Sequence, residues 1–285
     1  MSARKHSREG TFPPAPEPLP VAVPDSHTHI DITLEDDGVG GPSTVADALA
    51  LAEAAGVDRL VQVGVDVPSS QWGVRVAEEH PGVVATVALH PNDAPRLADL
   101  DAALREIERL AAHPRVRGIG ETGLDYFRTG EDGRKAQHES FRAHIAIAKR
   151  HGKTLVIHDR DAHDDILRVL DEEGAPDQVV MHCFSGDESF ARDCLDRGFL
   201  LSFAGTLTFG NARQLRAAAA ITPLDGLLVE TDAPFLTPTP FRGRPNASYL
   251  IPLTVRALAE VTGHDLDALC AALSANGTRA FGQWR

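Results

Sequence analysis

Short apolar runs alternate with helical patterns along almost the whole chain, and this alternation is the strongest constraint on its fold. The runs are uninterrupted and rich in β-branched residues, as is usual for strands buried on both faces of a parallel sheet. We predict eight strands, over residues 20–26, 58–65, 83–89, 116–121, 153–158, 178–182, 199–203 and 226–231. Helical patterns fill the intervals, over residues 44–56, 70–80, 97–113, 134–151, 162–173, 187–197 and 210–220, and two more follow the last strand near 252–262 and 265–280.

Eight strands that alternate with helices imply parallel pairing through right-handed crossovers, and eight parallel strands are enough to close a barrel. We therefore predict an α/β fold, a (β/α)8 TIM barrel formed by a single domain over residues 21–285. The alternative is an open, doubly wound sheet, but no GxGxxG phosphate loop follows the first predicted strand.

The first 20 residues are polar and contain the proline-rich stretch TFPPAPEPLP. They lack the apolar segment of a secretory signal, so we expect residues 1–20 to be a disordered tail. No apolar stretch approaches the roughly 20 residues that span a bilayer. The three cysteines, Cys183, Cys194 and Cys270, show no CxxC spacing, which favours reduced thiols and a cytoplasmic location.

The net charge of −13 bears on the kind of substrate the protein can hold. Proteins that bind duplex DNA nonspecifically present a basic face, because neutralising phosphates supplies most of that affinity. Past the tail, this chain has no run rich in lysine and arginine. A nucleic-acid substrate must therefore be held locally, by metal ions and a few arginines, and not by the field of the whole protein.

Histidine or a carboxylate stands at the end of five of the predicted strands, where the carboxyl ends of parallel strands gather in a barrel. His27 and His29 alternate with Thr28, so both imidazoles point in one direction. The candidate metal ligands are His27, His29, Glu121, His158, His182 and Asp232. Each one alone has an ordinary structural explanation, such as a turn or a bond to a carbonyl, but their joint occurrence at one end of a barrel predicts a metal centre.

Four imidazoles and two carboxylates suffice for two divalent ions about 3.5–4 Å apart, with Glu121 bridging them. Paired ions lower the pKa of a bound water and stabilise both the attacking and the leaving oxygen, which suits hydrolysis of phosphoesters or amides. We assign the catalytic roles to Asp232, as metal ligand and acceptor of the water proton, and to Glu121. The imidazole-rich set favours Zn²⁺ or Mn²⁺ over Mg²⁺ by ligand softness.

Several motifs resemble those of the TatD-type metal-dependent deoxyribonucleases, namely DSHTHID, GETGLDYF, IHDRDA, HCFSG and LLVETDAPFL followed by RGRPN. The resemblance extends over about residues 20–282 and implies an (α/β)8 barrel among the amidohydrolase-like metal hydrolases. It also implies that the six candidates above are the metal ligands and that Mg²⁺ or Mn²⁺ supports activity. Glu121 stands where many amidohydrolases have a carbamoylated lysine, which is evidence against a urease-like or dihydroorotase-like enzyme.

Two further positions are candidates for binding substrate. His90 in ALHP matches the histidine of the family's GVHP motif and is expected on the substrate phosphate, although a backbone-bonded histidine explains it equally well. Arg160 can pair either with Asp125 or with a phosphate. Asp159 departs from the family, which commonly has Cys, Thr or Ser there, and an added carboxylate near the metals would alter metal preference or repel phosphate.

The leading functional prediction is a hydrolase that cleaves DNA phosphodiesters with two divalent ions, as a 3′–5′ exonuclease that prefers single strands. Unpaired bases would stack on Phe184, Tyr126 or Phe127. The alternative is a small-molecule amide or ester hydrolase on the same barrel, since fold and metal site do not dictate substrate. A non-catalytic metal-binding protein is disfavoured, because six ligands for two ions leave the site open. We expect DNA as the substrate, no membrane partner and a monomer.

Overall fold

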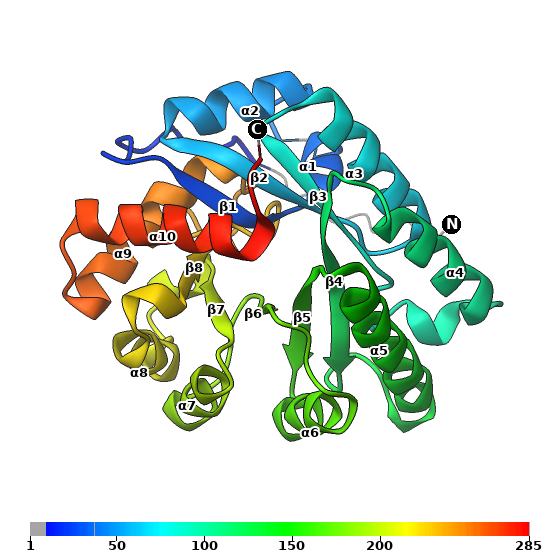
Figure 1. Ribbon diagram of the computed structural model, residues 1–285. Helices are drawn as coiled ribbons and strands as arrows, with labels where there is room; N and C mark the ends of the chain where they lie inside the picture. The colour runs from blue at the N-terminus through cyan, green and yellow to red at the C-terminus, as the bar shows by residue number, and fades with distance from the viewer. Residues whose placement is uncertain (1–9, 37, 285) are drawn as a thin grey trace.

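The computed structural model describes residues 10–36 and 38–284, and it shows one sheet of eight parallel strands surrounded by helices (Figure 1). The strands are hydrogen-bonded in the order in which they occur in the chain. They are β1 (Val23–Thr28), β2 (Val57–Val63), β3 (Val83–Val87), β4 (Val116–Asp125), β5 (Thr154–Arg160), β6 (Val179–Met181), β7 (Leu200–Phe203) and β8 (Leu227–Val229). The predicted (β/α)8 barrel in a single domain is confirmed, and each predicted strand overlaps an observed one.

The helices that cover the sheet follow the predicted alternation. They are α1 (Ile30–Leu34), α2 (Val45–Ala54), α3 (Val67–Glu79), α4 (Leu100–Ala111), α5 (Glu131–His151), α6 (His163–Glu173), α7 (Glu188–Asp196), α8 (Arg213–Ile221), α9 (Ile251–Thr262) and α10 (Leu266–Phe281). Short 3-10 helices lie at Ala94–Arg96, Gly205–Thr208, Leu224–Gly226 and Ser248–Leu250. Within the described ranges, no helix combines the length and the apolar character that a membrane span requires.

The segment that follows β8 closes the barrel against β1. The backbone N–H of Asp232 donates to the carbonyl of His27, and the N–H of His29 donates to the carbonyl of Ala233, both at 2.9 Å. Below these bonds, the buried carboxylate of Asp25 accepts from the backbone N–H and the hydroxyl of Thr231, at 2.9 and 2.6 Å. This seam places Asp232 directly beside His27 in β1 and His29 just after it.

Two apolar layers hold the barrel together. The larger one lies between the sheet and the surrounding helices. The smaller one joins side chains from several strands to Phe281 and Trp284, and the indole N–H of Trp284 points to the carbonyl of Leu60 in the first half of β2. The chain's last helix and the residues after it therefore cover the amino-terminal ends of the strands, which leaves the carboxyl-terminal ends for the site.

Residues 10–20 differ from the disordered tail that the sequence predicts for residues 1–20. The side chain of Phe12 is only 5% exposed and packs in a small cluster with Ala55, Ala247, Tyr249 and Leu250. Residues 1–9 lie outside the described part of the chain.

The proline-rich segment is fixed through its carbonyl groups. Proline lacks an N–H donor but keeps its carbonyl, and side chains of the barrel donate to this segment. The guanidinium of Arg244 donates to the carbonyls of Thr11 and Phe12, both at 2.7 Å, and the Tyr249 hydroxyl donates to that of Pro13 at 2.6 Å. Residues 10–20, whose composition is typical of linkers, therefore form an ordered segment against the barrel, which we call the strap.

Replacing Phe12 by Ala should lower the free energy of unfolding by about 3 kcal/mol, the usual cost of removing a buried aromatic ring. The ring fills the space next to Gly38 and Gly41, so its loss leaves a cavity. Urea denaturation of the variant measures the change, with Val21→Ala as a control at an exposed apolar position. A midpoint equal to that of the wild type would show that the strap adds no stability.

A buried histidine in α5 should make the fold sensitive to acid. Nε2 of His144 accepts the N–H of Leu89 at 3.1 Å, so Nδ1 carries the proton and donates to the carbonyl of Ser140 at 2.6 Å. Burial lowers the pKa of His144 to about 4, only partly offset by the Ser140 bond.

Because the unfolded chain binds this proton near pH 6.5, the stabilisation is complete above that pH and is lost as the pH falls toward 4. Between pH 7 and pH 5 the loss amounts to about 2 kcal/mol. His144→Gln should remove this part of the pH dependence, measured as the difference in urea stability at the two pH values. Equal losses in both proteins would contradict the assignment.

Candidate metal centre

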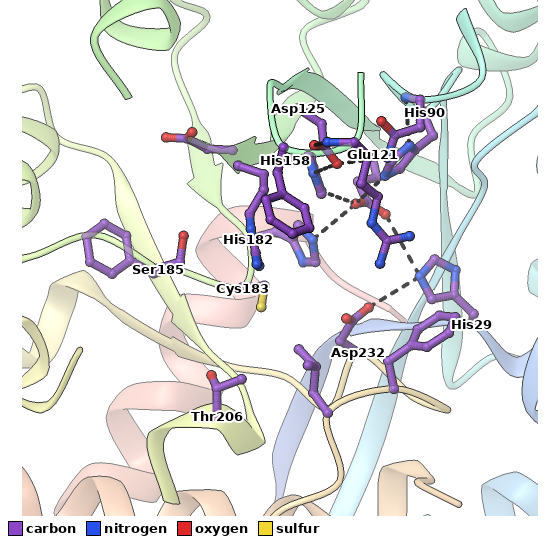
Figure 2. A pocket seen from close by; sticks show the side chains of 18 of the residues that line it. His29, His90, Glu121, Asp125, His158, His182, Cys183, Ser185, Thr206 and Asp232 are labelled. Atoms are coloured by element: carbon purple, nitrogen blue, oxygen red, sulfur yellow. Dashed lines mark hydrogen bonds and ion pairs between the residues drawn. The ribbon is translucent and has the colours of Figure 1, made fainter. Parts of the chain in front are cut away.

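A cavity of about 1100 Å³ opens at the carboxyl-terminal ends of the strands, and five of the six predicted metal ligands line it (Figure 2). These are His29, Glu121, His158, His182 and Asp232, while the sixth, His27, is fully buried beneath them. The sequence predicts that these side chains meet although they are up to about 200 residues apart along the chain, and the structure brings them together.

Glu121, in the middle of β4, lies at the centre of the group. Its Oε1 is 2.7 Å from Nδ1 of His158, 3.2 Å from Nε2 of His182 and 3.2 Å from Nε2 of His90. One carboxylate oxygen therefore faces three imidazoles, which come from the loop after β3, from β5 and from the loop after β6.

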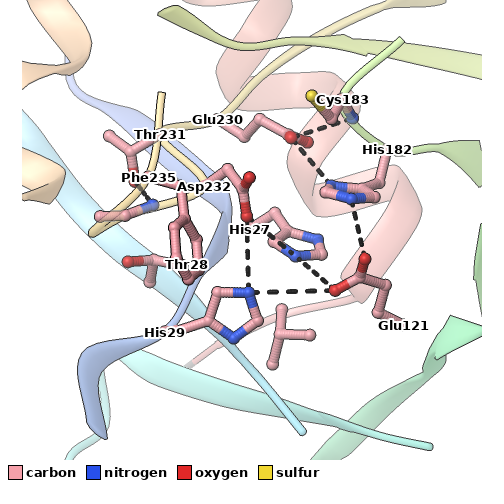
Figure 3. Close-up of polar contacts among 12 residues, drawn as sticks. His27, Thr28, His29, Glu121, His182, Cys183, Glu230, Thr231, Asp232 and Phe235 are labelled. Atoms are coloured by element: carbon pink, nitrogen blue, oxygen red, sulfur yellow. Dashed lines mark hydrogen bonds and ion pairs between the residues drawn. The ribbon is translucent and has the colours of Figure 1, made fainter. Parts of the chain in front are cut away.

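The other oxygen of Glu121 faces His27 in β1 and His29 just after that strand (Figure 3). Oε2 lies 3.5 Å from Nε2 of His27 and 3.9 Å from Nε2 of His29. Across from it, Oδ1 of Asp232 is 3.7 and 3.4 Å from the same two nitrogens. Glu121 thus divides the site into two groups of donors and presents one oxygen to each.

The donor atoms fit divalent cations. The ligand atoms of His27, His29 and Asp232 all lie within 4.8 Å of one another, and so do those of His90, Glu121 and His158. In the described part of the chain, both ring nitrogens of His27 and Nδ1 of His29 are buried without a hydrogen-bond partner. A buried imidazole without a partner is costly, and a cation beside its nitrogen removes that cost.

The carboxylates of the site are held in their charged form. Burial alone would raise the pKa of Glu121, but the imidazoles of His90 and His182 and the bond from His158 hold it well below its usual range. Burial also opposes ionisation of Asp232, yet its bond with His29 and the nearby His182 lower its pKa. Both groups are therefore anionic at neutral pH, as metal ligands must be.

A second layer of acidic and amide groups orients the imidazoles. The fully buried Glu230 places Oε1 2.9 Å from Nδ1 of His182 and accepts the backbone N–H of Cys183 at 2.9 Å (Figure 3). On the other side, the carboxylate of Asp125 lies 3.2 Å from Nε2 of His158 and accepts from Nδ2 of Asn92 at 2.8 Å. Such contacts fix the ring orientation of a ligating histidine.

The two predicted substrate-binding residues lie at different depths. His90 is 7% exposed, lines the inner part of the cavity and lies 3.2 Å from Glu121, so it belongs to the cluster of imidazoles. Arg160 lines the cavity, and its guanidinium lies over the ring of Phe127, 4.9 Å from the centroid. Of its two expected partners, Asp125 is instead bonded to His158 and Asn92.

Asp159, the departure from the family motif, is bonded to the start of α6. Its Oδ1 accepts the N–H of Ala162 at 3.2 Å, and its Oδ2 lies 2.6 Å from Nδ1 of His163. The added carboxylate therefore lines the cavity with both of its oxygens bonded at the start of α6. Nothing in the sequence marks Asn92, because an asparagine two residues after His90 belongs to no periodic pattern.

Comparison with known proteins agrees with this geometry. The family model described as TatD related DNase matches residues 24–282. The chain belongs to this family. A relative from Mycobacterium tuberculosis, named uncharacterized metal-dependent hydrolase TatD, is 48% identical over 262 residues, which are 90% of this chain and 97% of the relative. A relative from Escherichia coli K12, named uncharacterized metal-dependent hydrolase YcfH, is 38% identical and covers 90% of this chain and 94% of its own length.

Solved structures of the same family share the barrel. The crystal structure of YJJV, a TatD homologue from Escherichia coli K12, superimposes with a TM-score of 0.82 at 26% identity. The match covers 91% of this chain and 97% of that one. The sequence-based resemblance to the TatD family is thus confirmed, and the family's barrel is the one described above.

Proposed function

We propose that the protein is a divalent-metal-dependent hydrolase that cleaves phosphodiesters of single-stranded DNA from the 3′ end. The observation that carries this proposal is the position of Glu121, with one oxygen toward each of two donor groups. The family membership and the names of its relatives, which are metal-dependent hydrolases, support the same class of enzyme.

Two ions, Mg²⁺, Mn²⁺ or Zn²⁺, are proposed to bind on either side of Glu121. One would be held by His27, His29 and Asp232, the other by His158 and His182, with Glu121 common to both. His90 lies close enough to the second group to contact either an ion or a phosphate oxygen. When bound, the ions lower the pKa of a water and neutralise charge on the phosphate.

The chemistry of the surrounding residues follows from their charge and position. Asp232 is anionic, is 14% exposed through its side chain and faces the cavity, so it takes the proton as the water oxygen attacks phosphorus. The bond between phosphorus and the 3′ oxygen of the preceding nucleotide breaks, and that oxygen gains a proton from solvent. A 5′-mononucleotide leaves, and the strand is one residue shorter.

Three arginines stand among the acidic residues of the cavity wall and offer local contacts for phosphate groups. Arg96, Arg128 and Arg160 line the cavity, from the 3-10 helix after β3, the loop after β4 and the last residue of β5. A guanidinium bonds two phosphate oxygens at once, so these residues can hold the phosphates next to the scissile one. Chain polarity, the preference for DNA, the monomer and the cytoplasmic location remain predictions from the sequence.

The polarity is tested with single-stranded oligonucleotides that carry the label at either end. With Mn²⁺ added to the metal-free protein, a 5′-labelled strand should give a ladder of shortening products. A 3′-labelled strand should release its label as a mononucleotide in the first turnover. The opposite pattern would reverse the polarity, and internal cuts in a circular strand would indicate an endonuclease.

A small-molecule amide or ester hydrolase is the second candidate. The size of the cavity, about 1100 Å³, is the observation that favours it, since pockets for small ligands reach about 1,000 Å³. Intact DNA in the presence of a metal-loaded protein that hydrolyses small esters or amides would establish this alternative.

A further inference from the structure

We propose, building on the DNA hydrolase function above, that two arginine–phenylalanine stacks beside the cavity are binding subsites for unpaired nucleobases. The first stack is Phe127 with Arg160. Phe127 follows β4, lines the cavity and is 65% exposed, which is unusual for so large an apolar side chain. The Arg160 guanidinium, from the end of β5, covers one face of the ring.

The second stack lies in the loops of β7 and β8. Phe209 follows the 3-10 helix Gly205–Thr208 and lines the same cavity, and the Arg242 guanidinium lies 3.9 Å from its ring centroid. Strands β4 and β5 are separated from β7 and β8 by β6 in the order of the barrel. The two stacks therefore flank the site from different sides, and a single-stranded DNA that crosses the site meets both.

The other aromatic side chains near the cavity are engaged elsewhere. Phe184 is 2% exposed, so the sequence-based suggestion that a base stacks on it is wrong. Tyr126 is not part of the cavity lining, and its hydroxyl is bonded to His138 and Asp165. Phe235 lines the cavity but packs edge-on against His29, at a centroid distance of 6.0 Å, and so belongs to the metal cluster.

This pairing of residue types suits single strands. An aromatic ring stacks on the flat face of any base, and a guanidinium adds a cation–π contact and can bond the adjoining phosphate. In a duplex those base faces are covered by their neighbours. A protein of net charge −13 cannot attract DNA through its overall field, so stacking at two positions supplies affinity that does not depend on charge.

The test compares Phe127→Ala and Phe209→Ala with Phe241→Ala. Phe241 is a matched control, because it also lies under an arginine, Arg244 at 5.2 Å, but is not part of the cavity lining. The substrates are a single-stranded oligothymidylate and a strand of the same length with abasic sites. Abasic strands keep the phosphates and lose the bases.

Each cavity variant should reduce the KM advantage of the base-bearing strand over the abasic strand on the order of 10-fold, with kcat little changed. The Phe241 variant should keep the wild-type ratio. The proposal is overturned if both cavity variants retain the wild-type ratio, or if the control loses it equally.

Binding of the same two strands, followed by fluorescence anisotropy with no metal added, separates this inference from the hydrolase proposal. If the wild type binds the base-bearing strand more tightly and loses this preference in the two variants, the subsites stand even if no strand is cleaved. Cleavage with no difference in binding between the two strands would refute the subsites and leave the hydrolase proposal intact.

Discussion

Asp232→Asn is expected to reduce the turnover of single-stranded DNA by on the order of 10³-fold, within the range that removal of a general base produces. The variant loses the negative charge that lies 3.4 Å from His29 and 3.7 Å from His27. It therefore loses both a proposed metal ligand and the acceptor for the water proton.

The fold should tolerate this change. Asp232 has a φ of +52°, a left-handed conformation that Asn adopts as readily as Asp. Its contribution to the barrel seam is a backbone bond to the carbonyl of His27, which the substitution keeps. Initial rates on a labelled oligonucleotide measure the effect, and Asp193→Asn on the exposed face of α7 is a control with the same loss of charge. If Asp232→Asn keeps more than a tenth of the wild-type turnover, Asp232 is not the acceptor of the water proton.

Glu121→Gln should weaken binding of divalent metal by at least about 100-fold, more than the loss of a residue that only orients a ligand. Both oxygens of Glu121 face imidazole nitrogens, one toward each donor group. The amide has one oxygen and one NH₂ group, so it presents a donor of hydrogen bonds to one of the two sites and removes the shared negative charge.

Titration of metal-free protein with Mn²⁺, followed by calorimetry, measures this loss. Glu230→Gln is the matched comparison, since Glu230 is a fully buried glutamate whose Oε1 is bonded to His182 and to the backbone N–H of Cys183. It should weaken binding by about 10–100-fold. If Glu121→Gln binds Mn²⁺ as the wild type does, Glu121 is not a shared ligand.

Much of the fold could be predicted because its pattern is local. A buried parallel strand appears in the sequence as a continuous apolar run, and a surface helix as a repeat near 3.6 residues. Helix α5 illustrates this, since the helical pattern over residues 134–151 stops where the helix does, at His151, and Gly152 follows with a φ of +58°. The meeting of the six ligands could be predicted because the carboxyl ends of all barrel strands lie on one face of the barrel.

Features that depend on contacts between distant parts of the chain could not be predicted in this way. Strand β4 continues past Glu121 to Asp125, because Gly123 allows a close approach in which a Cβ would lie 2.1 Å from the carbonyl of His158. Helix α1 has only five residues, too few for a periodicity. The order of residues 10–20 depends on side chains such as Arg244 and Tyr249, which lie more than 200 residues away in the sequence.

The depth of His90 is a further example. Its motif predicts a position near the phosphate, and its distance of 3.2 Å from Glu121 depends in addition on how β3 and β4 pair. Asn92 becomes visible only through the bond it makes to Asp125, whereas Glu230 stands two residues before Asp232 in the sequence, where side chains of a strand point the same way. A sequence pattern thus identified the residues that gather at the site, and the structure shows which of them orient the others.

The central claim, a metal centre shared through Glu121, is tested most directly by a crystal soaked in Mn²⁺ and measured at a wavelength where manganese scatters anomalously. The account predicts two anomalous peaks about 3.5–4 Å apart on either side of Glu121. One should lie against His27, His29 and Asp232, and the other against His158 and His182. A single peak that does not contact Glu121 would contradict the shared metal centre. The absence of any peak, with the imidazoles in the positions described above, would contradict it as well.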